Sequence, residues 1–413
     1  MANTITTSEP YRESPIPLLD SALIFHVFPT FGVGGVQVRM TEVINHLGDA
    51  FRHTILALDG DYACKDRLSA EAPVTFLPPP TERRGLIKGL GGIRKTLKMH
   101  RPDLLLTYNW GAIEWAFANT ISPISRHIHL ESGFGLEEAD HQLFRRVLFR
   151  RIALARTRRV VVPSEALVRI ARRDWKLASK KVSLIPDGID CIKFSASPDP
   201  MKRPTFSPSS NQLLVGAIGP LRLEKNLGFL LEAFAAMTPG FDVRLVIVGK
   251  GPEQASLEQR AQALGIADRV TFTGHLEAVE QALPWFDVLA LTSRTEQTPN
   301  GVLQAMAAGK PVVSVDVGDV RLMLCPENRQ FVTPKNDKQA FVQALERMLA
   351  DSEIRARIGS GNQVHVREHY SLDRMVAAYK ELLTTSTLDK GAQNPGAAST
   401  GQRADEARTI SDG

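Results

Sequence analysis

Short runs of apolar and β-branched residues alternate with amphipathic helical segments along most of this chain, and this alternation limits the possible folds more than any other feature. Such alternation predicts a parallel sheet with helices on both faces. Doubly wound sheets of this kind bind ligands at the carboxyl ends of their strands. In the first half of the chain the runs are 22–28, 53–58, 74–77, 103–107, 127–130, 160–162 and 182–186.

A polar, proline-rich segment divides the pattern into two blocks. Residues 195–211 contain four prolines and several serines, a composition typical of a linker. A chain of 413 residues is also too long for one core, because cores rarely grow beyond about 250–300 residues. We therefore predict an α/β protein of two doubly wound domains that face each other across a cleft. The runs of the second block are 213–218, 244–248, 270–273, 288–291 and 312–315.

The predicted domain boundaries follow from composition and pattern. We assign residues 21–192 to an N-terminal domain and residues 193–370 to a C-terminal domain. The last helical pattern, 371–385, would either close the second domain or cross back to the first, and we assign it to the first. Residues 1–20 and 386–413 are polar and are expected to form a disordered leader and tail.

Bulk features indicate a cytoplasmic protein. The three cysteines lie far apart, which argues against a disulfide framework and fits a reducing compartment. Residues 1–17 lack the apolar segment of a signal peptide, and no apolar run reaches the roughly 20 residues of a membrane-spanning helix. The net charge of +5 is mild for this length, so its distribution matters more than its total.

Two loops carry groups suited to a diphosphate. Gly34 and Gly35 lie in a glycine-rich turn between a predicted strand and a predicted helix, where backbone N–H groups can bind phosphate. A simple tight turn is the alternative, since the spacing is not that of the dinucleotide fingerprint. Arg222 and Lys225 follow the strand at 213–218 and can neutralise a leaving pyrophosphate. There the alternative is a solvated loop with ordinary surface charges.

A third polar loop follows the strand at 288–291 and leads into a helix at 301–308. Glu296 would lie in this loop at a strand end, where a carboxylate can bind sugar hydroxyls, and Gln304 lies on the following helix. The alternative is that Glu296 only caps that helix.

Four segments, taken in order, resemble the retaining, family-four glycosyltransferases of the GT-B type, and the likeness covers about residues 22–385. The strongest is 296–313, which is similar to the family signature of two glutamates separated by seven residues that runs into EAMA-G-PVV. The others are 186–190, similar to PNGVD; 219–226, similar to GRL-x-x-EKN; and 248–252, similar to VGxGP. The resemblance implies the GT-B fold and transfer of a sugar from a nucleotide-sugar donor.

The resemblance also implies roles for particular residues. Glu296 would hold hydroxyls of the transferred sugar, and Lys225 would bind the diphosphate. Gly34 and Gly35 would close over the diphosphate from the first domain. His129 occupies the place of the family's active-site histidine, although a structural histidine hydrogen-bonded within the sheet is the alternative. Further donor contacts would come from Arg222, Thr298, Pro299, Asn300, Gly301 and Gln304.

Two positions depart from the family pattern. Gln304 replaces the second glutamate, which is expected to bind ribose hydroxyls; an amide still forms hydrogen bonds there, but without charge-assisted strength. Pro220 replaces the arginine that follows the glycine, and Arg222 would substitute for it if the loop turns inward. Donor affinity is the property that these changes affect.

The implied reaction needs neither a cofactor nor a metal. Lys225, Arg222 and helix N-termini can stabilise the charge on the departing diphosphate. The donor would be a UDP- or GDP-linked hexose-type sugar, and the acceptor a hydroxyl of a lipid-linked or polysaccharide precursor. Two alternatives stay open: a degenerate, non-catalytic binding subunit, which Gln304 and Pro220 motivate, and a nucleotide-sugar 2-epimerase.

An arginine-rich amphipathic stretch, 143–159, lies in the first domain. It predicts either docking on an anionic membrane, at the inner face of the plasma membrane where a lipid-linked acceptor would lie, or a solvated basic face over a buried apolar stripe. Nucleic acid is not expected as a partner, because no aromatic platform or matching motif accompanies the charge.

Overall fold

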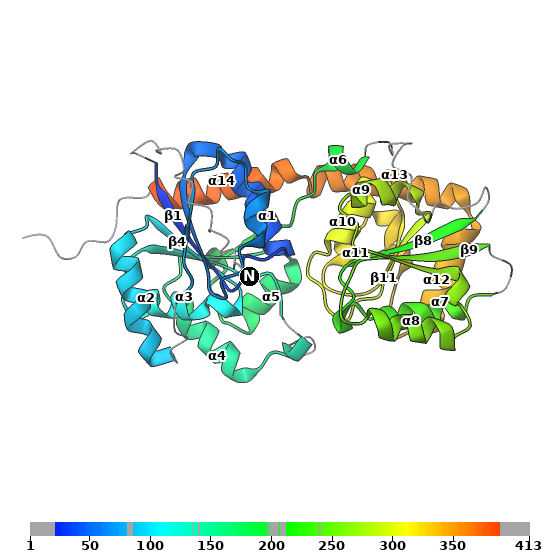
Figure 1. The fold of residues 1–413 in the computed structure, drawn as a ribbon, viewed down its shortest axis with the longest axis horizontal. Helices are drawn as coiled ribbons and strands as arrows, with labels where there is room; N and C mark the ends of the chain where they lie inside the picture. The colour runs from blue at the N-terminus through cyan, green and yellow to red at the C-terminus, as the bar shows by residue number, and fades with distance from the viewer. Residues whose placement is uncertain are drawn as a thin grey trace, which may run out of the picture.

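The protein folds into two lobes that lie side by side, with C-terminal helices running along both (Figure 1). The computed structural model describes residues 21–80, 86–134, 136–138, 141–195, 212–238 and 242–388, together with Ser197, Phe206 and Gly240. The expected leader, most of the expected linker and the tail beyond residue 388 lie outside the described residues.

The first lobe is built on a seven-stranded parallel sheet with the order β3-β2-β1-β4-β5-β6-β7. The chain starts in the middle, builds outward to one edge, and then returns to build the other half. This reversal between β1 and β4 is the kind of switch point where doubly wound sheets form ligand crevices. The strands are β1 Leu23–Phe28, β2 Arg52–Ala57, β3 Val74–Leu77, β4 Leu104–Tyr108, β5 Arg126–Leu130, β6 Arg159–Val162 and β7 Val182–Leu184.

Helices cover both faces of this first sheet. The central strands are buried on both sides, as their near-continuous apolar runs require. One core lies under α1 and the C-terminal helix, a second under α2 and α3, and a third among α3, α4 and α5. The helices are α1 Gly35–Leu47, α2 Leu86–His100, α3 Ile113–Ile121, α4 Phe144–Ala153 and α5 Glu165–Arg173. The short helix α6, Cys191–Ser195, follows them in the chain but packs on the second lobe.

The second lobe repeats the plan with a six-stranded parallel sheet in the order β10-β9-β8-β11-β12-β13. Its reversal lies between β8 and β11, and one continuous core fills the lobe. The strands are β8 Leu213–Ile218, β9 Val243–Val248, β10 Val270–Gly274, β11 Val288–Leu291, β12 Val312–Val315 and β13 Val332–Thr333. The helices are α7 Leu227–Ala235, α8 Gln254–Ala263, α9 Val279–Ala282, α10 Asn300–Ala307, α11 Val320–Met323 and α12 Lys338–Ala350.

Two long C-terminal helices join the lobes (Figure 1). Helix α13, Ser352–His369, packs on the second lobe, and α14, Leu372–Leu388, crosses back to contact α1 of the first. The helix predicted at 371–385 is thus present, but it runs to Leu388, three residues into the expected disordered tail. Its buried residues, such as Tyr379 and Leu383, complete the core of the first lobe, which explains why the last turn stays helical.

The two chain crossings between the lobes lie side by side. Ile189 N donates to Tyr370 O at 2.8 Å, and Leu372 N donates to Ile189 O at 2.9 Å. A Cβ on Gly188 would lie 2.8 Å from Ser371 O, so this close approach needs glycine at position 188. The segment 186–190, which resembles the PNGVD turn, therefore forms part of the connection between the lobes.

Helix α4 only partly fits the interpretation of a solvated basic face over a buried apolar stripe: Val147 and Ala153 are buried and Arg145 is exposed, but other residues depart from it. Arg150 is fully buried, and Arg146 turns inward to pair with Glu138 at 3.0 Å. Three large apolar residues instead point outward on one side of the helix, so the prediction of a buried apolar stripe is wrong for them. This α4 apolar face consists of Phe144, Leu148 and Ile152, which are 74%, 45% and 47% exposed.

The doubly wound architecture predicted from the sequence is confirmed. Strand β13 was not predicted, because its two residues, Val332 and Thr333, give no run that could stand out from a loop.

Candidate active site

Glu296 and Lys225 meet where two neighbouring strands of the second sheet end. The loop after β11 carries Glu296, the loop after β8 carries Lys225, and these strands are adjacent in the sheet. Lys225 Nζ donates to Glu296 Oε1 at 2.5 Å, and Ser293 Oγ donates to the same oxygen at 2.8 Å. Two residues predicted from separate motifs therefore form one partly buried ion pair, which we term the charged pair.

Glu296 does not cap helix α10, which was the alternative interpretation. Pro299 occupies the position before the helix, and no side chain accepts a capping hydrogen bond there. The hydrogen bonds of Glu296 go to Lys225 and Ser293 instead. The carboxylate is thus oriented by a cation and a hydroxyl from its own lobe.

A cavity of about 460 Å³ between the lobes opens in front of the charged pair. We term it the inner cavity. Its second-lobe wall carries the charged pair, and its first-lobe wall comes from the loops after β4 and β5 and from α4. Residues on that first-lobe wall include Trp110, Ser132, Gly133, Phe134, Arg146 and Arg150.

The glycine turn of the first lobe lies against the start of α10. Gly34 precedes α1 in an extended conformation, and a Cβ on Gly35 would lie 3.7 Å from Asn300 Nδ2. The next residue, Val36, lines the inner cavity together with the charged pair. The structure therefore brings the glycine turn and the charged pair to the same space between the lobes.

The start of α10 lies against the glycine turn, but four residues there line neither the inner cavity nor the larger cavity beside it: Thr298, Pro299, Asn300 and Gly301. The helix begins at Asn300, and the first N–H groups of a helix have no acceptor within it. A Cβ on Gly301 would lie 3.2 Å from Ile218 O, so the helix start packs closely on the end of β8. Thr298 turns its hydroxyl away and donates to Pro163 O of the first lobe at 3.0 Å. The helix start suits an anion, whereas Thr298 joins the lobes.

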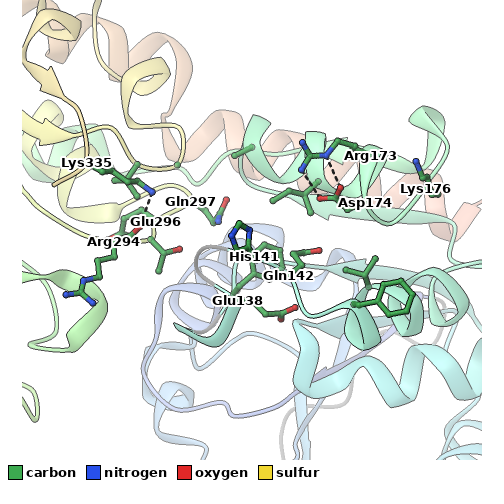
Figure 2. Close-up of a pocket in the computed structure, with 18 of the residues that line it drawn as sticks. Glu138, His141, Gln142, Arg173, Asp174, Lys176, Arg294, Glu296, Gln297 and Lys335 are labelled. Carbon is green, nitrogen blue, oxygen red and sulfur yellow. Dashed lines mark hydrogen bonds and ion pairs between the residues drawn. The ribbon is translucent and has the colours of Figure 1, made fainter. Parts of the chain in front are cut away.

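A larger cavity of about 680 Å³, which we term the outer cavity, lies beside the inner one. Both cavities share Phe134, Glu138, Thr295, Glu296 and Gln297. Figure 2 shows side chains of both lobes around the outer cavity, among them Arg294, Gln297 and Lys335 from the second lobe and His141, Arg173 and Lys176 from the first.

His129 lies beneath the site and not in it. The side chain is fully buried in β5, with Nδ1 hydrogen-bonded to Thr107 Oγ1 at 2.8 Å and Nε2 3.8 Å from Glu131 Oε2. It lines neither the inner nor the outer cavity. This geometry matches the alternative of a structural histidine within the sheet, and a role at the reacting atoms stays a prediction.

Arg222 and Gln304 also lie outside both cavities. The Arg222 side chain is 62% exposed, and its Nη1 lies 3.9 Å from Glu224 Oε1. The loop does not turn it inward in this structure, and a contact of Arg222 with a diphosphate stays a prediction. Gln304 is partly buried on the second turn of α10.

A clamp between the lobes holds the Glu296 loop, and sequence analysis missed it. Ser164 Oγ donates to Gln297 Oε1 at 2.7 Å. Asp319 accepts from the N–H groups of Glu165 and Ala166 at 2.5 and 3.1 Å, and so binds the N-terminus of α5 in the other lobe. Burial raises the pKa of Asp319, although the two N–H bonds oppose the rise. No motif signals this contact, because it joins residues 154 positions apart.

A buried arginine supports the first-lobe wall and was also missed. Arg150 donates from Nη1 and Nη2 to the two oxygens of Glu138, both at 3.2 Å, and its Nε lies 3.5 Å from Glu131 Oε2. The guanidinium is also surrounded by aromatic rings, so it has cation–π partners as well as anionic ones. Its distances to the ring centroids are 4.9 Å for Trp110, 5.1 Å for Phe134 and 5.2 Å for Trp175.

Gly318 leaves room for the Glu296 loop, which gives a first prediction. Its φ is +55°, and a Cβ there would lie 2.3 Å from the backbone oxygen of Glu296. We expect Gly318→Ala to lower the free energy of unfolding by about 1–3 kcal/mol and to displace the loop. Chemical denaturation measures the first effect, and the affinity for a nucleotide sugar measures the second.

The matched control for this prediction is Gly48→Ala. Gly48 has the same φ of +55°, but a Cβ there would meet no atom within 4 Å. The control variant therefore has the strain of a positive φ at alanine, but its Cβ collides with no other atom. Equal losses of stability and affinity in the two variants would show that the contact with Glu296 is unimportant.

Each of the two lobes matches a family of known protein domains. Residues 33–193 match the family described as Glycosyltransferase Family 4, and residues 212–351 match Glycosyl transferases group 1. One match falls on each lobe. The chain is a glycosyltransferase with the GT-B fold.

Two relatives show how far the likeness extends. The glycosyltransferase is 25% identical over 388 residues to 2-deoxystreptamine N-acetyl-D-glucosaminyltransferase of Streptomyces fradiae, which covers 82% of this chain and 91% of the relative. It is 30% identical over 172 residues to Alpha-D-kanosaminyltransferase of Streptomyces kanamyceticus, but this match spans only 40% of the chain and 45% of the relative.

Solved structures agree on the fold. Anabaena Alr3699/HepE in complex with UDP-glucose superposes with a TM-score of 0.73 at 20% identity, over 88% of this chain and 100% of that one. Sucrose-phosphate synthase from Thermosynechococcus elongatus superposes with a TM-score of 0.74 at 19% identity, over 88% and 98% of the two chains.

Proposed function

We propose that this glycosyltransferase moves a hexose-type sugar from UDP or GDP to an acceptor hydroxyl, with retention of configuration at the anomeric carbon. The observation that carries the proposal is the charged pair at the ends of adjacent strands, which opens on the inner cavity beside the start of α10. An ammonium group and N–H donors suit a diphosphate, and a carboxylate suits sugar hydroxyls.

Each group would have a separate task in this reaction. Lys225 would bind the diphosphate and stabilise the charge that develops as it leaves, and the N–H groups of Asn300 and Gly301 would add to this effect. Glu296 would hold sugar hydroxyls through Oε2, since both of its hydrogen bonds in the structure use Oε1. The acceptor hydroxyl would attack from the face that the leaving group vacates, and we assign no protein nucleophile.

The proposed chemistry uses cations of the chain and includes no metal or cofactor. Within the described part of the chain, no group of three or more His, Cys, Asp or Glu side chains is placed to hold a metal ion. In the proposed reaction, Lys225 and the helix start stabilise the leaving diphosphate.

The names of similar proteins support this donor class. Anabaena Alr3699/HepE forms a complex with UDP-glucose, and the two Streptomyces relatives are an N-acetyl-D-glucosaminyltransferase and a kanosaminyltransferase. UDP-linked hexoses are therefore the first donors to test.

The test is calorimetric binding of a panel of UDP- and GDP-sugars, followed by transfer assays. We expect one nucleoside diphosphate sugar to bind at least about tenfold more tightly than its nucleoside monophosphate, because Lys225 and the start of α10 contact the distal phosphate. Lys225→Gln should remove most of this difference. A wild-type protein that binds no member of the panel would contradict the proposal.

A second candidate is a binding subunit without turnover. The outward position of Arg222 and the amide of Gln304 favour it, because both weaken the contacts expected with the donor. Tight binding without release of the nucleoside diphosphate, under any acceptor tried, would support this candidate. Release of the nucleotide without any acceptor would instead indicate hydrolysis or 2-epimerisation.

We further propose that the α4 apolar face docks on an anionic membrane, where a lipid-linked acceptor would lie. Residues 143–181 contain thirteen Lys and Arg against two Asp and Glu, and Arg145 and Arg156 are among the exposed ones. Exposed apolar side chains beside basic ones suit the interface of an anionic bilayer. Among the described helices, none is long and apolar enough to cross a bilayer.

Co-sedimentation with vesicles tests the docking surface. We expect binding to vesicles that contain phosphatidylglycerol, little binding to phosphatidylcholine alone, and a loss of at least about fivefold in Phe144→Ser/Leu148→Ser, because burying these side chains supplies much of the affinity. Val364→Ser is the control, since Val364 is 57% exposed on the second lobe. Dimerisation of the wild-type protein that is lost in the α4 variant would show that a second copy covers this face.

A further inference from the structure

We infer that the outer cavity binds a phosphate group of the acceptor, and that the acceptor is an anionic amphiphile. The inference rests on the proposed glycosyl transfer, because it takes the cavity to be the acceptor side of the reaction. The outer cavity shares Glu296 with the inner one, so a molecule that fills it reaches the residue proposed to hold the donor sugar. Its volume of about 680 Å³ is that of a site for a small ligand.

The acidic side chains of the outer cavity are already neutralised. Each of the three that line it has a basic partner in the structure, so none is left to attract a cation. The pairs are Glu138 with Arg150 at 3.2 Å, Asp174 with Arg173 at 2.8 Å, and Glu296 with Lys225 at 2.5 Å.

Several basic side chains of the cavity, in contrast, have no acidic partner. Arg151 donates to the backbone oxygen of Asp174 at 2.7 and 2.9 Å, and Lys335 donates to the backbone oxygen of Arg294 at 3.1 Å. Neither these two nor Arg294 and Lys176 form an ion pair with any carboxylate that the structure describes. The lining therefore carries uncompensated positive charge.

The two lobes contribute equally to this charge. Arg151 and Lys176 belong to the first lobe, and Arg294 and Lys335 belong to the second. A phosphate in the cavity would therefore be attracted by cations of both lobes. Arg and Lys are the side chains with which proteins usually hold phosphate.

Part of the lining of the outer cavity is apolar. Phe134, Val147 and Ile170 contribute to it, and Phe144 links the cavity to the α4 apolar face. The cavity therefore offers a carboxylate for sugar hydroxyls, cations for phosphate, and apolar side chains that continue to the surface. A sugar joined through phosphate to an alkyl chain carries a group for each of these parts.

Calorimetry with simple amphiphiles tests this inference without knowledge of the natural acceptor. The probes are decyl phosphate, decyl glucoside and inorganic phosphate, each below its micelle concentration where it has one. We expect decyl phosphate to bind the wild-type protein at least about tenfold more tightly than either of the others, because only it offers both the charge and the chain.

Variants then locate the site. Arg294→Gln/Lys335→Gln should weaken decyl phosphate by about tenfold and leave the affinity for the nucleoside diphosphate unchanged, because both side chains lie outside the inner cavity. Arg357→Gln/Lys380→Gln removes the same charge from exposed positions outside both cavities and should change neither affinity.

Three results would overturn the inference. Equal affinity for decyl phosphate and decyl glucoside would exclude recognition of the phosphate. Equal affinity for decyl phosphate and inorganic phosphate would exclude an amphiphile. The same loss of affinity for decyl phosphate in both double variants would show that the overall charge of the protein, and not a site in the outer cavity, attracts the ligand. If nucleotide binding persists in any of these cases, the proposed function stands; if no nucleotide binds at all, it is the proposed function that fails.

Discussion

Glu296→Ala is expected to abolish sugar transfer and to leave the protein folded. The carboxylate would lose its contacts with the transferred sugar, and Lys225 would lose the partner that holds it at the mouth of the inner cavity. Loss of one such preorganised contact lowers kcat by about 10²–10³-fold, and Glu296 would serve two functions at once, so we expect a loss at or above this range. Steady-state kinetics with the donor found in the binding panel measure it.

The stability of this variant should change little. Glu296 is partly exposed, and an ion pair near the surface contributes about 1 kcal/mol or less to the free energy of unfolding. Glu277→Ala, an exposed glutamate of the same lobe, is the control for loss of charge and should keep normal kcat. Near-normal turnover in Glu296→Ala would refute the role assigned to this residue.

Local sequence features were enough to predict most strands of both sheets and to place Lys225 and Glu296 in loops at strand ends. The strands 74–77, 213–218, 288–291 and 312–315 lie where the apolar runs place them, and the last three are buried on both faces. Lys225 and Glu296 were each expected in a loop at a strand end, and the structure shows that the two strands are adjacent. Such arguments work because a doubly wound sheet always brings its carboxyl strand ends to one edge.

Contacts between distant parts of the chain could not be predicted in this way. Asp319 binds the start of α5 across the lobes, and Arg150 turns inward from a helix whose pattern suggested a solvated basic face. Helical periodicity shows which residues share a face, but it does not show whether that face meets solvent or a buried carboxylate. Glu131 and Glu138 decide the orientation of α4, and they lie before the helix in the sequence.

Arg150→Met is expected to cause the largest loss of stability of any variant considered. The substitution keeps an apolar side chain of similar length but removes the only cation that contacts both Glu131 and Glu138 among the described residues. Removing one partner of a buried ion pair leaves an uncompensated charge and costs about 3–5 kcal/mol in the free energy of unfolding. Urea denaturation at pH 7 measures the loss, and Arg145→Met, on the exposed side of the same helix, should lose about 0.5 kcal/mol or less.

The pH dependence of this loss separates charge from packing. Burial alone would raise the pKa of Glu138, but hydrogen bonds from Arg150 and Arg146 outweigh it and lower the pKa. In the wild type, the stabilisation from Glu138 is therefore present above the ordinary glutamate pKa of about 4.3 and is lost as the pH falls through the lowered value. In Arg150→Met most of this stabilisation is absent at every pH, so the difference between the two proteins should shrink as the pH falls below about 4.3. Arg150→Met/Glu131→Gln, which replaces a stranded carboxylate with a neutral amide, should recover part of the loss at pH 7. A difference that stays constant with pH and is not recovered in the double variant would mean that the aromatic rings around Arg150, and not the carboxylates, account for its effect.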